Sequence, residues 1–233
     1  MHKTNSEKIL DYCEKLSNLK LDSFENYIII NPYSSNKEQI KLITTKFYNK
    51  YYNDNKNRRL ILGSNPARRA TAVTGIPFED AIHIQQTTGI FIDNFYVNKS
   101  SSNFLYDVID KYGGCEKFYS DFYMNFVFPL GIAKINSKGS ESNCNYYEIK
   151  QFEKKLEQYI IDFIKEILKL DIDTSICYCI GSGKNYEYLL KINKEYNFFK
   201  TINPHEHPRF IMQNNSKNKD LYLKKYLTAL NMK

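Results

Sequence analysis

The chain has 233 residues, of which 42% are hydrophobic and 25% charged, and its formal net charge is +7 at pH 7. This length and balance suit one globular domain with a substantial core. They exclude a membrane-spanning protein, because no segment reaches the ~18–20 apolar residues of a span, and the start lacks the apolar run of a signal peptide. We therefore expect a single domain over residues 1–233, inside the cell and without a membrane partner.

Two further compositional features bear on partners and cofactors. The five cysteines are an odd number without any Cys-x-x-Cys pair, so free thiols are expected rather than a zinc site or an iron–sulfur cluster. The excess of Lys and Arg fits a polyanion such as DNA, because phosphates attract basic surfaces. A Lys-rich solvated surface explains the same excess.

The predicted elements alternate along the chain. A helix over residues 6–19 belongs to an N-terminal extension of residues 1–22. Four apolar runs bounded by turn residues then predict buried strands at 27–31, 60–63, 175–181 and 198–203. Helical patterns cover 37–52, 147–170, 185–196 and 219–231. Loops are predicted at 99–103 and 136–145, and the apolar run 122–135 is interrupted by Pro129 and Gly131.

These patterns define a fold class. Strands that are apolar on both faces suit a parallel sheet covered on both sides, and their alternation with helices implies βαβ units. The sequence thus predicts an α/β fold, a three-layer α/β/α sandwich with a central, mainly parallel four-stranded sheet. Ligands of such sheets bind beyond the carboxyl ends of strands, which points to Asn65, the Gly181-Ser182-Gly183 turn and His205.

Three motifs stand in order along the chain. They are GSNP at 63–66 with TGIPF at 74–78, then YMNFVFPL at 123–130, then NPHEHPR at 203–209. Together they resemble the G-x-N-P…T-G-[VI]-P-F, H-N-x-C-P-L and H-P-S-P-R motifs of the single-strand-selective monofunctional branch of the uracil-DNA glycosylase superfamily. The resemblance covers roughly residues 27 to 209.

The resemblance implies roles for the matching residues. Asn65 would orient the hydrolytic water, and Phe78 would stack on the extruded base. Asn125 would read the Watson–Crick edge of uracil, and His205 would donate a hydrogen bond to uracil O2. The remaining residues of the base pocket would be Gly63, Ser64 and Pro66, and the wedge that enters the duplex would be Glu206, His207, Pro208 and Arg209.

The chemistry of base removal requires such groups. A base inside a stack must be flipped into a pocket before it can be cleaved. The leaving base becomes anionic, so a preorganised donor gives the largest help, and a histidine at a strand end supplies one. An Asn amide matches the acceptor and donor of uracil's O4 and N3–H. An aromatic ring stacks on any base, for roughly 1–3 kcal/mol.

Several contacts to DNA are also expected. Arg68 and Arg69 follow Ala67, where the family has Gly, and would contact phosphate or narrow the choice of base. Gly181, Ser182, Gly183 and Lys184 form a turn before a helix whose amino terminus would hold a phosphate. Glu206 in the wedge needs a compensating cation near the DNA backbone. No carboxylate neighbours Asn65 in sequence, so no strong general base is in view and a modest rate is expected.

Other interpretations remain open. The histidine frame is ambiguous, because His207-Pro208-Arg209 also matches the start of the third motif; we prefer His205, which places Pro208-Arg209 on the family's P-R pair. The His-x-His pair lacks a third metal ligand. By themselves, Asn65-Pro66 is typical of a turn and Phe78 of a core aromatic.

The sequence therefore predicts a monofunctional glycosylase that removes uracil from single- or double-stranded DNA as the first step of base excision repair. Hypoxanthine and xanthine are further candidate bases. We expect a monomer that needs no metal or organic cofactor, with water as the nucleophile. The alternatives are a non-catalytic DNA-binding relative of the same fold and a nucleotide-binding protein that uses the turn at 181–184.

Overall fold

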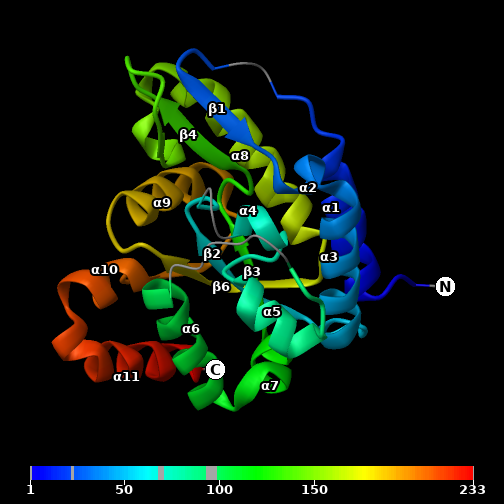
Figure 1. The fold of residues 1–233 in the computed structure, drawn as a ribbon. Helices are drawn as coiled ribbons and strands as arrows, with labels where there is room; N and C mark the ends of the chain where they lie inside the picture. The colour runs from blue at the N-terminus through cyan, green and yellow to red at the C-terminus, as the bar shows by residue number, and fades with distance from the viewer. Residues whose placement is uncertain (1, 22–23, 68–70, 93–98, 233) are drawn as a thin grey trace.

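The computed structural model describes residues 2–21, 24–67, 71–92 and 99–232 (Figure 1). Its central sheet has four parallel strands in the order β3-β2-β6-β7. The strands are β2 (Arg58–Gly63), β3 (Phe122–Phe126), β6 (Ile172–Ile180) and β7 (Thr201–His205). Leu60, Leu62, Cys177 and Cys179 in the middle of the sheet are 0% exposed, as strands covered on both faces require. The predicted α/β fold with a parallel four-stranded sheet is confirmed.

One predicted strand belongs to a different sheet. β1 (Tyr27–Ile30) pairs antiparallel with β4 (Gly131–Ile135), which pairs with β5 (Glu141–Asn143). The fourth central strand is instead β3, from the run that Pro129 and Gly131 divide into two strands. No residue of β1 is fully buried, and a short apolar run does not reveal which sheet it joins.

The predicted long helices are present with small shifts at their ends. They are α1 (Asn5–Ser17), α3 (Lys37–Tyr51), α8 (Glu153–Leu168), α9 (Lys184–Tyr196) and α11 (Lys219–Leu230). The start of the predicted helix 147–170 is two 3₁₀ turns, η1 (Tyr146–Glu148) and η2 (Lys150–Phe152). Thr4 and Glu7 form a capping box that fixes the start of α1.

Other helices were not predicted. They are α2 (Pro32–Ser35), α4 (Thr71–Thr74), α5 (Ala81–Thr88), α6 (Lys99–Tyr112), α7 (Gly114–Asp121), α10 (Pro208–Asn214) and the 3₁₀ turn η3 (Ser216–Asn218). The predicted loop 99–103 is the first turn of α6. Figure 1 shows α8 and α9 on one side of the central sheet and α6, α7 and α11 on the other. None of the helices in the described part of the chain has the length and apolarity that crossing a bilayer requires.

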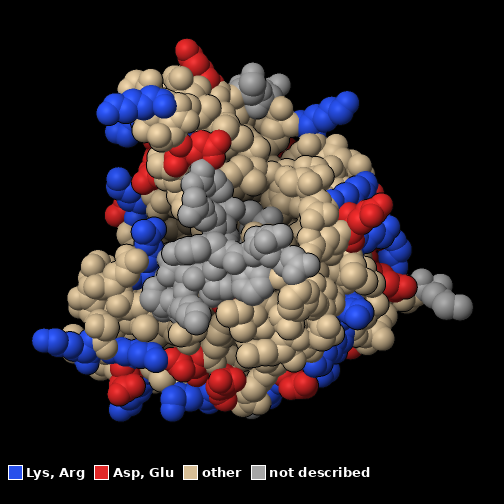
Figure 2. All heavy atoms as spheres, viewed as in Figure 1, with Lys and Arg blue, Asp and Glu red and all other residues tan. Residues whose placement is uncertain are grey.

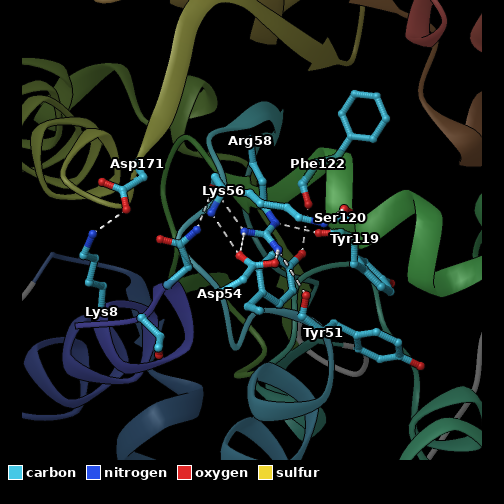
Figure 3. A network of polar contacts seen from close by, with 12 residues as sticks. Lys8, Tyr51, Asp54, Lys56, Arg58, Tyr119, Ser120, Phe122 and Asp171 are labelled. Carbon is cyan, nitrogen blue, oxygen red and sulfur yellow. Dashed lines mark hydrogen bonds and ion pairs between the residues drawn. The ribbon is translucent and has the colours of Figure 1, made fainter. Parts of the chain in front are cut away.

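A buried arginine anchors β2 at its amino end (Figure 3). Arg58 is 2% exposed, and its guanidinium donates to both carboxylate oxygens of Asp54, at 2.8 and 2.9 Å. It also donates to the backbone carbonyls of Tyr119 and Tyr51. A buried charge is tolerated when it is paired and hydrogen bonded in this way.

Candidate functional site

A cleft of about 1080 Å³ opens along the carboxyl ends of the central strands. Its described lining comes from the residues after β2, the segment 78–81, the ends of β3 and β6, the segment 143–148, the first turn of α9, and the helices α6 and α10. This is the edge at which parallel sheets bind ligands. Figure 2, seen from the same side as Figure 1, shows acidic and basic side chains intermixed over this face rather than gathered in one basic stripe.

The motif after β2 fastens a distant segment to the cleft wall. The Asn65 side-chain amide donates from Nδ2 to the carbonyl of Cys144 at 3.1 Å, and its Oδ1 accepts the N–H of Tyr146 at 3.2 Å. Ser64 Oγ donates to Asn145 Oδ1 at 3.1 Å. Both polar ends of the Asn65 amide are therefore engaged by backbone groups of the segment 144–146.

Two aromatic rings are stacked at this edge. The rings of Phe78 and Phe126 have centroids 4.8 Å apart and an interplanar angle of 28°. Phe78 has a φ of 65°, a left-handed conformation that is costly for a residue with a large side chain. Gly63 makes room for the pair, because a Cβ at this position would lie 2.5 Å from Phe78 Cζ. Strain of this kind persists where the surrounding packing enforces it.

His205 occupies the last row of the sheet on the same face as Phe126. Gly63 pairs with Phe126, and Ile180 pairs with His205. Because Leu62 pairs with Cys179, the next residues of β2 and β6 are level with each other, and these four residues form one row on one face. Phe126 and Ile180 line the cleft, whereas His205 is 1% exposed and is not among the described side chains that line it.

The surroundings of the His205 ring are aromatic. Its ring centroid lies 4.3 Å from that of Tyr226 and 5.9 Å from that of Tyr178. Neither ring nitrogen has a hydrogen-bond partner among the described residues. Burial, with the nearby charge of Lys225 acting in the same direction, lowers the pKa of His205 to about 4. The imidazole is therefore neutral at physiological pH.

His207 is placed differently from His205. Its side chain is exposed and lines the cleft, and its Nδ1 accepts the N–H of Arg209 at 3.0 Å, which caps α10. Pro208 and Arg209 also line the cleft, and Arg209 Nε donates to Gln213 Oε1 at 3.2 Å. The sequence did not single out Phe210, whose ring is 45% exposed beside them.

Glu206 turns away from this group toward α11. Its carboxylate forms an ion pair with Lys225 at 2.7 Å. Partial burial would raise the pKa of Glu206, but the bond to Lys225 lowers it overall. Lys225 is thus the compensating cation that the sequence required. Glu206 is not among the described residues lining the cleft.

Asn125 lies on the opposite face of the sheet from His205. It is 2% exposed, donates from Nδ2 to the hydroxyl of Tyr123 at 3.0 Å, and accepts the N–H of Phe126 at 2.8 Å. Asn125 is one residue before the last row, so the alternation of the strand directs its side chain away from Phe126 and the cleft. The structure does not bring Asn125 among the described groups lining the cleft.

The turn after β6 lies on the cleft as predicted. Its lining residues are Gly181, Ser182, Gly183 and Lys184. Gly181 has a φ of 106°, which a residue with a side chain rarely adopts, and its N–H donates to the carbonyl of His205 at 2.8 Å. The turn leads directly into α9, whose first N–H groups lack side-chain caps and suit an anion. Arg68 and Arg69 lie outside the described residues.

The cleft also contains carboxylates that the sequence did not connect with Asn65. Glu79, Asp80 and Glu148 line it. Glu79 is 2% exposed and is hydrogen bonded to His83 and to the Tyr119 hydroxyl. Asp80 is 9% exposed and accepts the N–H of His83, which caps α5. Glu148 is exposed, and its Oε2 accepts the N–H of Asn145 at 2.7 Å.

His83 carries a positive charge beside the buried Glu79. Burial alone would lower the pKa of His83, but hydrogen bonds to Cys115 and to Glu79 outweigh it and raise that pKa to about 10. The ring also stacks on Tyr106, with centroids 3.9 Å apart. Within the described part of the chain, no group of three His, Cys, Asp or Glu side chains is arranged to hold a metal ion.

Comparison with known proteins identifies the family. A model of the uracil DNA glycosylase superfamily matches residues 49–231, so the chain belongs to that superfamily. Among solved structures, the chain is similar to the crystal structure of wild-type SMUG2 from Pedobacter heparinus. The two share 39% sequence identity with a TM-score of 0.91, over 98% of this chain and 97% of that chain. No curated protein matches the chain. Family and neighbour together support a function of uracil-DNA glycosylase type.

Proposed function

We propose that this protein is a monofunctional DNA glycosylase that hydrolyses the N-glycosidic bond of uracil in DNA and so begins base excision repair. Hypoxanthine and xanthine are further candidate substrates. The observation that carries the proposal is the last row of the central sheet. There a buried histidine without a hydrogen-bond partner among the described residues shares one face with the Phe78–Phe126 pair at the cleft.

The two histidines differ in ways that favour His205 as the donor to the base. His207 already has a structural task, because its Nδ1 caps α10. A buried polar group without a partner is costly and rare, so it calls for a functional explanation. A base oxygen that reached His205 would supply the missing partner.

The charge state of His205 suits this task. A neutral imidazole donates an N–H bond to a carbonyl oxygen and strengthens that bond as the base becomes anionic. Burial keeps the pKa of His205 near 4, so above that pH the ring stays neutral, with one nitrogen carrying the N–H donor. The proton of the N–H remains on the ring while the glycosidic bond breaks.

The aromatic pair would receive the flipped base. Phe78 and Phe126 are stacked on each other in the free protein, and a base that stacks on Phe78 exchanges one aromatic partner for another. The wedge would fill the gap left in the duplex, with His207, Pro208 and Arg209 on the cleft and Phe210 beside them. Glu206, held by Lys225, would support this segment from behind.

Contacts to the DNA backbone would come from the far side of the cleft. Lys184 and the uncapped N–H groups at the start of α9 face the cleft, and Arg209 borders it. Such groups bind phosphate with little dependence on sequence. We keep Arg68 and Arg69 as proposed phosphate contacts on the sequence alone.

Asn65 and Asn125 would act less directly than the motifs imply, because the side chains of both are already hydrogen bonded within the protein. Asn65 would fix the position of the segment 144–146. It would thereby orient the hydrolytic water through this part of the cleft wall. Asn125 would contribute to base recognition only if its bonds to Tyr123 and Phe126 were exchanged for bonds to the base.

The direct test is cleavage of labelled oligonucleotides that carry one uracil, hypoxanthine or xanthine, in single strands and in duplexes, followed by alkali. Strand cutting only after alkali is the expected result for a monofunctional glycosylase. His205→Asn should lose base release and keep DNA binding, whereas His207→Asn should keep most of the release. A folded protein that binds DNA and releases no base would instead be a non-catalytic relative.

A further inference from the structure

We propose that Glu148 is the general base that activates the hydrolytic water in this cleft. The inference rests on the proposed glycosylase function and adds a catalytic group that the sequence motifs do not contain. Water must be deprotonated as it attacks the sugar, and a carboxylate at the reacting centre performs this step in the hydrolysis of other glycosidic bonds. The residue at the expected place for such a group, Asn65, is an uncharged amide.

Elimination among the described carboxylates of the cleft leaves Glu148. Glu79 is 2% exposed and is bound to both His83 and Tyr119, so its charge is already compensated inside the core. Asp80 is 9% exposed, so its carboxylate, which caps α5 through the N–H of His83, is largely shielded from solvent. Glu148 has an exposed side chain on the wall of the cleft. It is therefore the described cleft carboxylate best placed to meet a water molecule and a substrate.

A chain of hydrogen bonds connects Glu148 with the motif after β2. Ser64 donates to the Asn145 side chain, and the Asn145 N–H donates to Glu148 Oε2. Asn65 holds the two residues that flank Asn145. The motif at 63–66 thus positions the carboxylate across the cleft wall, although the two lie about 80 residues apart in sequence.

The Glu148 carboxylate acts electrostatically on the neighbouring Cys144 thiol. Burial raises the pKa of the Cys144 thiol to about 11, with the Glu148 carboxylate adding in the same direction. A negative charge at the mouth of a DNA-binding cleft opposes the approach of phosphates. An oxocarbenium-like sugar, in contrast, carries positive charge that the same carboxylate stabilises.

The proposed step balances without a further reactant. A water molecule gives a proton to the Glu148 carboxylate while its oxygen forms a bond to the sugar C1′. The bond from C1′ to the base nitrogen breaks, and its electron pair leaves with the base as an anion stabilised by the His205 N–H. The proton on Glu148 then passes to the base or to solvent, which yields the free base and an abasic site.

The test compares Glu148→Gln with the control Glu195→Gln. Both remove one negative charge, and Glu195 is exposed near the carboxyl end of α9, outside the described cleft lining and away from the first turn of that helix. The glutamine side chain in Glu148→Gln retains an amide oxygen to accept the N–H of Asn145, so the segment should keep its fold. Single-turnover cleavage, DNA binding and thermal unfolding would be measured for the wild type, both variants and Glu148→Asp.

We expect Glu148→Gln to slow single-turnover cleavage by about 100-fold or more with unchanged or tighter DNA binding. Glu148→Asp should be intermediate, and Glu195→Gln should match the wild type. A Glu148→Gln variant as fast as the control overturns the general-base role while the proposed function stands. If Glu148→Gln loses folding or DNA binding to the same extent as it loses cleavage, the general-base role is overturned as well, in favour of a structural role. A wild type that releases no base overturns both proposals.

Discussion

The buried histidine gives a pH dependence of stability that can be calculated from its surroundings. His205 is 1% exposed, and burial lowers its pKa from the ordinary 6.5 to about 4 in the folded protein. The unfolded chain therefore takes up the proton first as the pH falls. Stability contributed by the neutral ring is present above pH 6.5 and is lost between pH 6.5 and 4. The perturbation that isolates this contribution is His205→Asn, which removes the titrating group.

The size of the effect follows from the two pKa values. Lowering the pKa from 6.5 to about 4 corresponds to about 3 kcal/mol when the protonated state is fully reached. Between pH 7 and pH 5 the unfolded histidine becomes almost fully protonated while the folded one stays neutral, and the loss is about 2 kcal/mol. Titrating groups that are not coupled to His205 contribute equally in the wild type and the variant and cancel in the comparison, whereas Glu206 is coupled to the ring.

Urea unfolding at pH 7 and pH 5 measures this difference. The wild type should lose about 2 kcal/mol more unfolding free energy over this interval than His205→Asn. The absolute stability of the variant is not the readout, because an Asn in the same place is also without a partner. If both proteins show the same pH dependence, His205 is accessible to water and protons in the free protein. The argument that a base supplies its missing hydrogen bond would then fail.

Three other expectations follow from particular contacts. In Gly63→Ala the new Cβ would lie 2.5 Å from Phe78 Cζ. This variant should lower the free energy of unfolding by about 1–3 kcal/mol and abolish base release. An unchanged temperature of thermal unfolding would contradict the close contact. Phe210→Ala should slow cleavage of duplexes several-fold more than cleavage of single strands, because its 45% exposed ring would fill the vacated stack; equal losses on both substrates would speak against the wedge. Hydrogen bonds raise the pKa of His83 to about 10, so stability should fall as the pH rises from 7 to 10, and His83→Gln should remove most of this dependence in urea unfolding.

The sequence predicted the fold class because its signal is local. The strands β2, β6 and β7 overlap the apolar runs at 60–63, 175–181 and 198–203, and the long helices repeat their apolar residues with a helical period. The choice between β1 and β3 as the fourth strand depended on pairing partners, which periodicity does not encode. The helices α5, α6, α7 and α10 were missed, and three of these contain eight residues or fewer. Short helices depend on tertiary packing more than on their own pattern.

The candidate site shows a similar division between local and distant information. The residues after the strands, such as Asn65 and Lys184, lie on the cleft because parallel strands end at one edge. Glu148 was missed because its place on the cleft depends on contacts with a motif that is far away in the sequence. It also lies just after the loop predicted over 136–145, in a segment predicted to be helical. The signal that was available is the N-x-x-E pattern of Asn145 and Glu148, a capping box that marks an ordered turn rather than a loose loop.

Selection of the base must come from hydrogen bonds rather than from stacking. An aromatic pair such as Phe78 and Phe126 is worth about 0.5–1.5 kcal/mol beyond its buried area, and a base stacked on an aromatic ring is worth roughly 1–3 kcal/mol. The free energy of replacing the Phe78–Phe126 stack by a stack of Phe78 on a base is therefore close to zero, and it is similar for every base. Of the two side chains that the motifs assign to hydrogen bonding with the base, Asn125 is directed to the opposite face of the sheet, and His205 remains to discriminate. A single donor distinguishes bases by one oxo group, and we therefore expect the oxo-purines to be released along with uracil.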